Sequence, residues 1–202
     1  MSAIAELLDI SSPALGPDTQ AARLKDSGLQ SLLQQRNGFF ALQNALWVFS
    51  DNSLLELPGH DDPAIADWLT HYPKTRGCTH CFAVDAIGYP FVTSEHGILR
   101  MDLETGVFTR IAPDIEGWAR LMLAKFQQLS AWAVCKQWQD IHGPLPDGHR
   151  LLPRMPFVGG GTETADNLLA TPLIELIRFY SDLATQIRNM PEGGTIEIRL
   201  AE

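Results

Sequence analysis

The clearest hydrophobic pattern lies in the middle of the chain, at residues 80–111. Four short runs with partial alternation of apolar and polar positions are separated by turn residues at Gly88, His96-Gly97 and Thr105-Gly106. A period of two is typical of strands with one buried face, and glycine accepts the positive φ of tight turns. The pattern predicts an antiparallel meander. The side chains expected to face inward are Phe82, Val84, Phe91, Ile98, Met101, Val107 and Ile111.

Helical spacing of apolar residues follows the meander in three segments. The first begins after Asp114, its expected N-cap, and the second runs from about Ser130 to Ile141. The third is the clearest, with Thr171 as its expected N-cap and Pro172 in its first turn, where the fixed φ of proline is tolerated. Its apolar stripe consists of Leu173, Leu176, Ile177, Tyr180, Ala184 and Ile187.

The remaining segments are read from weaker patterns. Residues 195–200, TIEIRL, alternate and predict a closing strand, whereas the proline-rich and glycine-rich residues 142–164 predict loops. Near the start of the chain, a helix is expected over residues 19–35, with a break at Ser27-Gly28 left open. The run 39–50 is strand-like, and a helical turn near Gln43-Asn44 is the alternative.

Strands gathered in the middle and helices after them indicate an α+β domain rather than alternating β-α-β units. The length of 202 residues suits a single domain. We expect a central antiparallel sheet, formed by the meander at about 80–111 and the closing strand at about 195–200, flanked by helices. Residues 1–35 are expected to be an unassigned N-terminal loop and helix, and residues 36–202 the main domain.

Charge changes the picture in one respect. The chain has 24 acidic and 15 basic side chains, a formal charge of −9. Binding to nucleic acid needs a basic patch that neutralises phosphates, and no segment here is rich in lysine and arginine. The same balance suits a basic protein partner, because opposite charges steer association.

The acids are concentrated in residues 51–67, which contain no lysine or arginine. One interpretation is a solvated acidic loop, and the other is a recognition face for a basic partner, with aromatic anchors beside the acids. Trp47 is a further aromatic candidate, and burial of the tryptophans in the core is the alternative for them. The residues expected to bind the partner are Asp51, Glu56, Asp61, Asp62, Asp67, Trp68 and Tyr72.

Three motifs with possible chemistry are weak. Cys78-Thr79-His80-Cys81 has the CxxC spacing of zinc and redox sites, but no second CxxC follows, so a turn entering a strand with Cys81 buried is favoured. His60-Asp61 resembles the pair of some metal-dependent phosphohydrolases, yet it lies in a predicted loop. The triplet 159–161 lacks the Gly-Lys-Ser/Thr that a phosphate-binding loop needs. We therefore expect a protein without catalytic residues, metal or cofactor.

The location follows from the same kind of reading. The apolar runs are too short to cross a bilayer, and the first residues lack the basic start of a signal peptide. Three cysteines do not suggest a disulfide framework. The expectation is a cytoplasmic protein with no membrane partner.

Several short motifs together resemble one family. The C-terminal third contains Pro156-Phe157-Val158-Gly159-Gly160, then Asn167-Leu168, a long helix, and Met190-Pro191-Glu192-Gly193. Further motifs lie upstream of these, in chain order. The aromatic run 38–49 comes first, and a Phe-x-x-Asp-x-x-Gly-x-x-Phe spacing follows at Phe82, Asp85, Gly88 and Phe91. Asp102-x-x-Thr-Gly and the predicted helix that begins after Asp114 and contains Trp118 come next. Over residues 36–200 this order resembles bacterial immunity proteins of the SUKH superfamily and the related carboxy-terminal domain of type VI secretion immunity proteins. Gly161 and Met190 depart from the pattern.

The resemblance implies a SUKH-like fold and a role in binding. Such proteins protect a bacterium by occluding a toxin, often a nuclease, and an acidic inhibitor can mimic phosphate in a basic cleft. The matched residues are turn, core and capping positions, so no catalytic residue is implied. The alternatives are a scaffold or regulatory module of the same fold and a metal-dependent phosphohydrolase.

Overall fold

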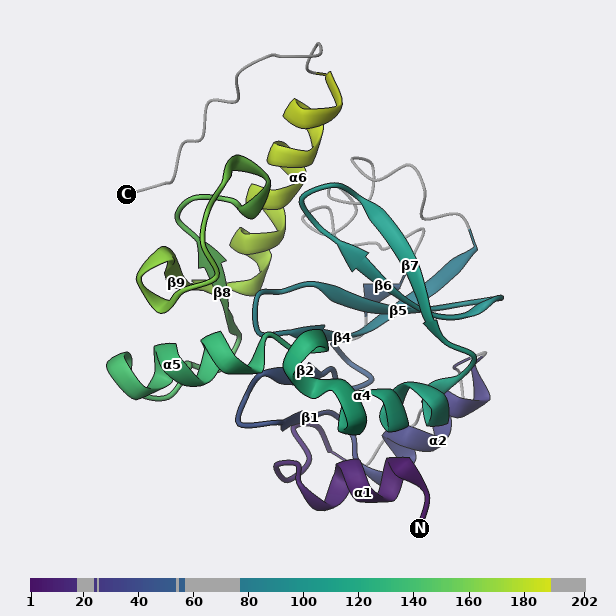
Figure 1. The fold of residues 1–202 in the computed structure, drawn as a ribbon. Helices are drawn as coiled ribbons and strands as arrows, with labels where there is room; N and C mark the ends of the chain where they lie inside the picture. The colour runs from purple at the N-terminus through teal and green to yellow at the C-terminus, as the bar shows by residue number, and fades with distance from the viewer. Residues whose placement is uncertain (18–23, 25, 54, 57–76, 190–202) are drawn as a thin grey trace.

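The computed structural model describes residues 1–17, 24, 26–53, 55–56 and 77–189. They form an α+β fold in which helices surround a central antiparallel sheet (Figure 1), so the predicted fold class is confirmed. The predicted closing strand at 195–200 lies outside the described residues. None of the described helices is both long and apolar enough to cross a lipid bilayer.

The meander forms four consecutive strands of the central sheet, from β4 out to the edge strand β7. Its strands are β4 (Cys78–Asp85), β5 (Pro90–Ser94), β6 (Gly97–Asp102) and β7 (Val107–Ala112), each antiparallel to the next. Five of the seven predicted inward side chains are fully buried. The other two, Val107 and Ile111, lie on the outermost strand, and Val107 is 49% exposed. The prediction for Val107 was wrong because alternation alone does not show which strand lies at the edge.

The aromatic run 39–50 adds a hairpin beside β4. Strands β1 (Phe39–Ala41) and β2 (Leu46–Val48) pair with each other, and β2 pairs with β4. Between them Leu42, Gln43 and Asn44 all have positive φ, so the strand-like prediction holds for the two ends of the run, and a tight reversal joins them at the place where a helical turn was the alternative. The short strand β3 (Leu55–Glu56) pairs with the other end of β4.

Two helices precede the hairpin within the described part of the chain. Helix α1 (Ala3–Asp9) was not predicted, because its apolar residues occupy only two turns of an otherwise unmarked N-terminus. Helix α2 (Ser27–Gln35) begins at the break considered in the sequence, where the Asp26 carboxylate accepts the N–H of Leu29 at 2.8 Å. Leu24 is not helical, so the helix does not extend back over it towards the predicted start at Thr19.

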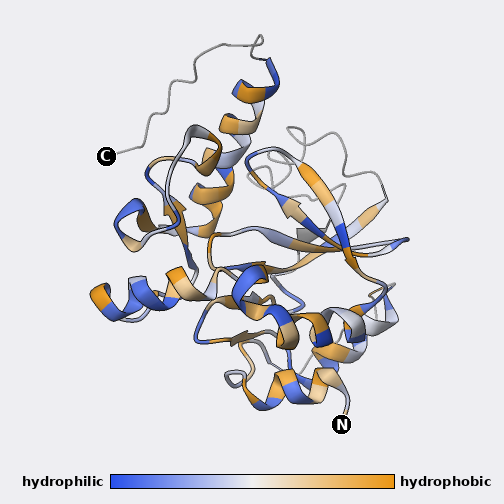
Figure 2. Cartoon of the chain, in the orientation of Figure 1, coloured by the Kyte–Doolittle hydropathy of each residue, from blue (hydrophilic) through white to orange (hydrophobic). Residues whose placement is uncertain are grey.

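The predicted helices after the meander are present. Helix α4 (Ile115–Leu129) has Asp114 as its N-cap, as expected, and helix α5 (Trp132–His142) follows after Ser130 and Ala131. Figure 1 places α1, α2 and α4 together, with α5 continuing from α4. The helices carry both hydrophobic and hydrophilic segments (Figure 2), in keeping with amphipathic helices that bury one face.

The C-terminal part forms a second, two-stranded sheet. Strands β8 (His149–Pro153) and β9 (Leu168–Pro172) pair, and the 3-10 turns η2 (Phe157–Gly159) and η3 (Ala165–Asn167) lie between them in the chain. Helix α6 (Leu173–Asn189) packs against this hairpin. The expectation of loops over 142–164 was therefore wrong for β8, and Thr171 is a strand residue paired with Arg150 rather than a helix cap.

Candidate functional site

Only two of the seven predicted partner-binding residues fall within the described chain. Asp51 is half-buried, and its Oδ1 accepts a hydrogen bond of 2.7 Å from Nδ2 of Asn37, while its own N–H donates to Oδ1 of Asn37 at 2.8 Å. Glu56 is in β3, opposite His80. Asp61, Asp62, Asp67, Trp68 and Tyr72 lie outside the described residues. The role of all seven residues in binding stays a prediction. Asp51 also has a structural contact, its pair of hydrogen bonds with Asn37.

The described residues contain a second acidic region that the sequence did not reveal. A cleft of about 540 Å³ opens where the N-terminal ends of α2 and α4 meet the β5–β6 turn. Among the described residues, its lining includes four carboxylates, those of Asp26, Glu95, Asp114 and Glu116, and no lysine or arginine. We call this the acidic cleft. The four acids come from three separate segments, so no local spacing could have brought them together.

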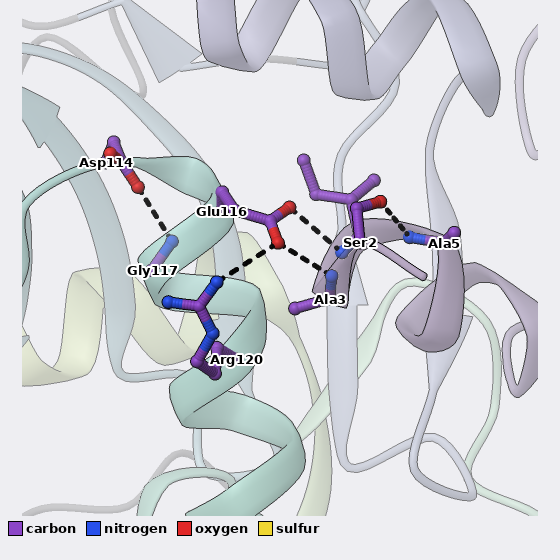
Figure 3. Close-up of polar contacts among 8 residues, drawn as sticks. Ser2, Ala3, Ala5, Asp114, Glu116, Gly117 and Arg120 are labelled. Carbon is purple, nitrogen blue, oxygen red and sulfur yellow. Dashed lines mark hydrogen bonds and ion pairs between the residues drawn. The ribbon is translucent and has the colours of Figure 1, made fainter.

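Three of the four acids also hold the helices in place. Asp26 and Asp114 cap α2 and α4, and Asp114 Oδ1 accepts the N–H of Gly117 at 2.7 Å. Glu116 reaches across to α1, where its carboxylate accepts the N–H groups of Ala3 at 2.7 Å and Ile4 at 3.3 Å (Figure 3). These contacts satisfy free donors at helix starts, so the carboxylates are fixed in position.

The fourth acid is free to face a partner. Glu95 lies in the exposed turn between β5 and β6, with a side chain 71% accessible, and its charge is near the equally exposed His96 at 3.5 Å. An ionised carboxylate has about four acceptor sites, so the capping acids retain acceptor capacity beside Glu95. The cleft is therefore suited to ammonium or guanidinium groups from another molecule.

The CxxC motif lies inside strand β4 rather than in a turn before it. Cys78 and Cys81 are free thiols and are buried. Burial raises the pKa of both thiols, which disfavours the thiolate that metal binding and redox exchange require. Within the described part of the chain, no three His, Cys, Asp or Glu side chains are grouped to hold a metal ion. The burial predicted for Cys81 is confirmed, and His60-Asp61 lies outside the described residues.

The glycine triplet belongs to a braced turn. The carboxylate of Glu104, from the β6–β7 turn, accepts the N–H of Phe157 at 2.9 Å and of Val158 at 2.6 Å. Gly161 passes so close to the carbonyl of Met155 that a Cβ at this position would lie 1.8 Å from the oxygen. Glu104 thus takes the two N–H groups before the triplet, and the N–H groups of the three glycines donate to the carbonyls of Pro156 and Phe157. The backbone donors that a phosphate would need are therefore already used, and the motif holds the turn in place.

Two arginines that the fold draws inward were also missed, Arg100, which is half-buried, and Arg150, which is buried. Arg100 donates to Asp85, which in turn accepts the N–H groups of Ile87 and Tyr89 and thereby closes the β4–β5 turn. Arg150 is 1% exposed, and its guanidinium lies 4.9 Å from the ring centre of Trp47. Sequence patterns do not flag such residues because charged side chains are ordinarily expected on the surface.

Comparison with known proteins adds information on the fold. No protein-family model matches the chain, and no curated protein matches it at a significant level. The crystal structure of Atu4351 from Agrobacterium tumefaciens is similar, with a TM-score of 0.53 and 12% sequence identity over 86% of each chain. At this identity the likeness shows a shared fold and nothing about activity.

Proposed function

We propose that this chain is an immunity protein of the cytoplasm that binds a basic secreted toxin and blocks its active site. The resemblance of the ordered motifs over residues 36–200 to type VI secretion immunity proteins supports the proposal. The observation that carries it is the acidic cleft. Its described lining has four carboxylates and no lysine or arginine, and the Arg120 guanidinium, 3.5 Å from Glu116, balances only one of them, so the local potential is negative.

The negative charge of the cleft affects how fast the partner associates as well as how tightly it binds. A negative surface accelerates association with a positive one and orients it, and both effects weaken as salt screens the charges. A stable complex also needs roughly 1,600 Å² of total buried surface, so the cleft acts as the polar centre of a larger interface. A nuclease is the class of toxin expected, since carboxylates can replace phosphates in a basic cleft.

The acidic segment 51–67 supports the same proposal from the sequence. It contributes five acids to the chain's charge of −9. Asp61, Asp62 and Asp67 are proposed to contact the toxin together with Glu95. Asp26, Asp114 and Glu116 are not chosen for mutation, because removing these carboxylates would also loosen α1, α2 or α4.

The experiment has two stages. A tagged chain is expressed in its native host, and captured proteins are identified by mass spectrometry. The captured protein is then produced in a host lacking this chain, alone and together with it. The proposal predicts growth arrest that co-expression relieves. A captured protein that does no harm to the host would instead indicate a scaffold or regulatory module.

A matched pair of variants links relief to the cleft. Glu95→Gln removes one exposed carboxylate from the lining, and Glu163→Gln removes an exposed carboxylate outside it. Both lower the net negative charge equally. Weaker binding for Glu95→Gln but not for Glu163→Gln would support a role of the cleft in binding the toxin. Equal effects of the two variants would show that only the net charge of the protein matters.

A further inference from the structure

The two outer edges of the central sheet are treated differently by the fold. At one edge the chain covers β1 with its own N-terminal segment: Ser12 donates its N–H to Phe40 at 2.7 Å, and Leu15 donates to Gly38 at 3.0 Å. At the other edge lies β7, with which no strand besides β6 pairs in the described part of the chain. Figure 1 shows the β6–β7 hairpin extending from the sheet.

The register identifies which backbone groups of β7 point outward. Ser94 and Gly97 flank a two-residue turn, so they form a hydrogen-bonded pair, and backbone groups alternate sides from there along β6. Arg100 therefore faces Thr109, and the N–H and C=O groups of Phe108 and Arg110 point away from the sheet. Among the described residues, none is hydrogen-bonded to these outward groups.

The usual protection of an edge strand is weak here. Natural edges are blunted by prolines, repeated charges or a covering element. β7 reads VFTRIA, with no proline and a single charged residue, although one register irregularity occurs between Ile98 and Leu99 of its partner β6. Val107, Thr109 and Arg110 are exposed. Such an edge can accept an added strand.

A cleft beside the strand supplies a place for side chains. It has a volume of about 290 Å³ and is lined by Val107, Thr109 and Ile111 of β7, by Arg100 and Asp102 of β6, and by Leu129 of α4. A strand added to β7 would direct every second side chain towards this face, which is how β-strand addition gains specificity.

The braced turn carries two further exposed apolar side chains. Glu104 holds the backbone of Val158, and Glu104 is three residues before Val107 in the chain. Val158 and Met155 are 47% and 48% exposed. These two side chains and Val107 account for three of the large hydrophobic residues exposed in the described chain, and all belong to segments joined through Glu104.

We propose that the outer edge of β7 binds an extended segment of the toxin as an added strand, with an uncharged side chain in the cleft that β6, β7 and Leu129 of α4 line. This inference rests on the proposed function. A partner protein is favoured over a second copy because two chains of charge −9 repel each other. Basic residues flanking the added segment would be attracted by the same charge.

The test compares Arg110→Pro with Arg110→Ala. Both remove the side chain that donates to the carbonyl of His96, but proline alone removes the outward N–H and obstructs a neighbouring strand. The probe is the protein captured from the native host by the wild-type chain, purified and titrated by biolayer interferometry. We expect Arg110→Pro to weaken binding roughly tenfold or more relative to Arg110→Ala, and Phe108 and Arg110 amides to be protected from hydrogen exchange in the wild-type complex.

A second pair guards against misfolding. Val107→Lys places a cation in the lining of the cleft that is proposed to take an uncharged side chain, and Val107→Thr keeps the β-branched shape. Weaker binding by the lysine variant alone supports the inference. Wild-type binding by Arg110→Pro and Val107→Lys would overturn it and leave the proposed function standing. Capture of no toxin by the wild-type chain would overturn both. A wild-type dimer that Arg110→Pro converts to a monomer would assign the edge to a second copy and overturn the inference.

Discussion

Arg100 donates a hydrogen bond of 2.6 Å from Nη2 to Oδ2 of Asp85, a carboxylate with no exposed side-chain surface. The pair joins β6 to the end of β4, and Oδ1 of Asp85 accepts two backbone N–H groups of the β4–β5 turn. One carboxylate thereby fixes three elements of the meander. Burial of Asp85 is tolerated because a cation and two amide donors surround it.

Breaking this pair from one side should be costly. Arg100→Met leaves the Asp85 carboxylate buried without its cation, and we expect a loss of about 3 kcal/mol in the free energy of unfolding. Asp85→Asn should cost less, about 1 kcal/mol, because the amide oxygen can still accept from Ile87 and Tyr89. Urea unfolding of the two variants and the double variant measures the coupling. Additive effects would contradict a direct interaction.

Glu104 should make stability depend on pH. Burial raises the pKa of its carboxyl, while hydrogen bonds from Val158 and Phe157 oppose the rise. The folded protein then binds this proton more strongly than the unfolded chain does. Its contribution is fully present below the unfolded pKa of about 4.3 and is lost as pH rises through the higher folded pKa.

The corresponding measurement compares the wild type with Glu104→Gln. We expect the stability of the wild type relative to the variant to fall as pH rises through that window, because only the wild type titrates there. Urea unfolding at a series of pH values from 4 upwards follows the difference. A difference that rises with pH would show that the two backbone donors, rather than burial, control this group.

Removing the buried charge of Arg150 should cost little stability or even increase it. Its guanidinium is buried against Phe40 and Trp47, and burial lowers its pKa to about 10. Among the described residues, its Nε and Nη2 have no hydrogen-bond partner. Contacts of a cation with aromatic rings contribute about 2 kcal/mol, whereas burying the charge costs several. Arg150→Met should therefore be within about 1 kcal/mol of the wild type or more stable.

Thermal unfolding of Arg150→Met, with Arg150→Lys as the charged control, measures this balance. The lysine variant keeps the buried charge without the planar stacking group and should be less stable than the methionine variant. A loss of more than about 2 kcal/mol in Arg150→Met would contradict this balance and indicate that the contacts of the guanidinium outweigh the cost of desolvating it.

The three cysteines should be inert in the folded protein. Cys78, Cys81 and Cys135 are buried, and burial raises the pKa of Cys135 to about 11. Since the thiolate is the reactive form, alkylation by iodoacetamide at pH 7.5 should be negligible in the native state and complete in urea, as read by mass spectrometry. Rapid native labelling of Cys78 and Cys81 would restore a redox or metal-binding role as a candidate.

The sequence predicted what depends on local periodicity. The four strands of the meander and the helix capped by Asp114 were found because their spacing and caps are properties of neighbouring residues. Strand β8 was missed because prolines on both sides resemble a loop, although Pro153 itself is a strand residue. Thr171 was misread because a residue that suits an N-cap can equally pair in a strand.

The candidate site was harder to predict for a different reason. Asp26, Glu95 and Asp114 are distant in sequence and meet only when α2, α4 and the β5–β6 turn pack together. The burial of Arg150 likewise depends on tertiary contacts with the β1–β2 hairpin. Local charge density could find residues 51–67, but it could not find acids that converge through folding.

The association rate of the purified captured partner, measured against sodium chloride concentration, tests the central claim most directly. Binding through an acidic surface predicts an association rate that falls steeply as salt increases. At low salt, we expect a rate about twofold to threefold lower for Glu95→Gln and for the variant in which Asp61, Asp62 and Asp67 are all changed to Asn. Glu163→Gln should have a rate close to that of the wild type. An association rate that is independent of salt and the same in all four proteins would contradict the account.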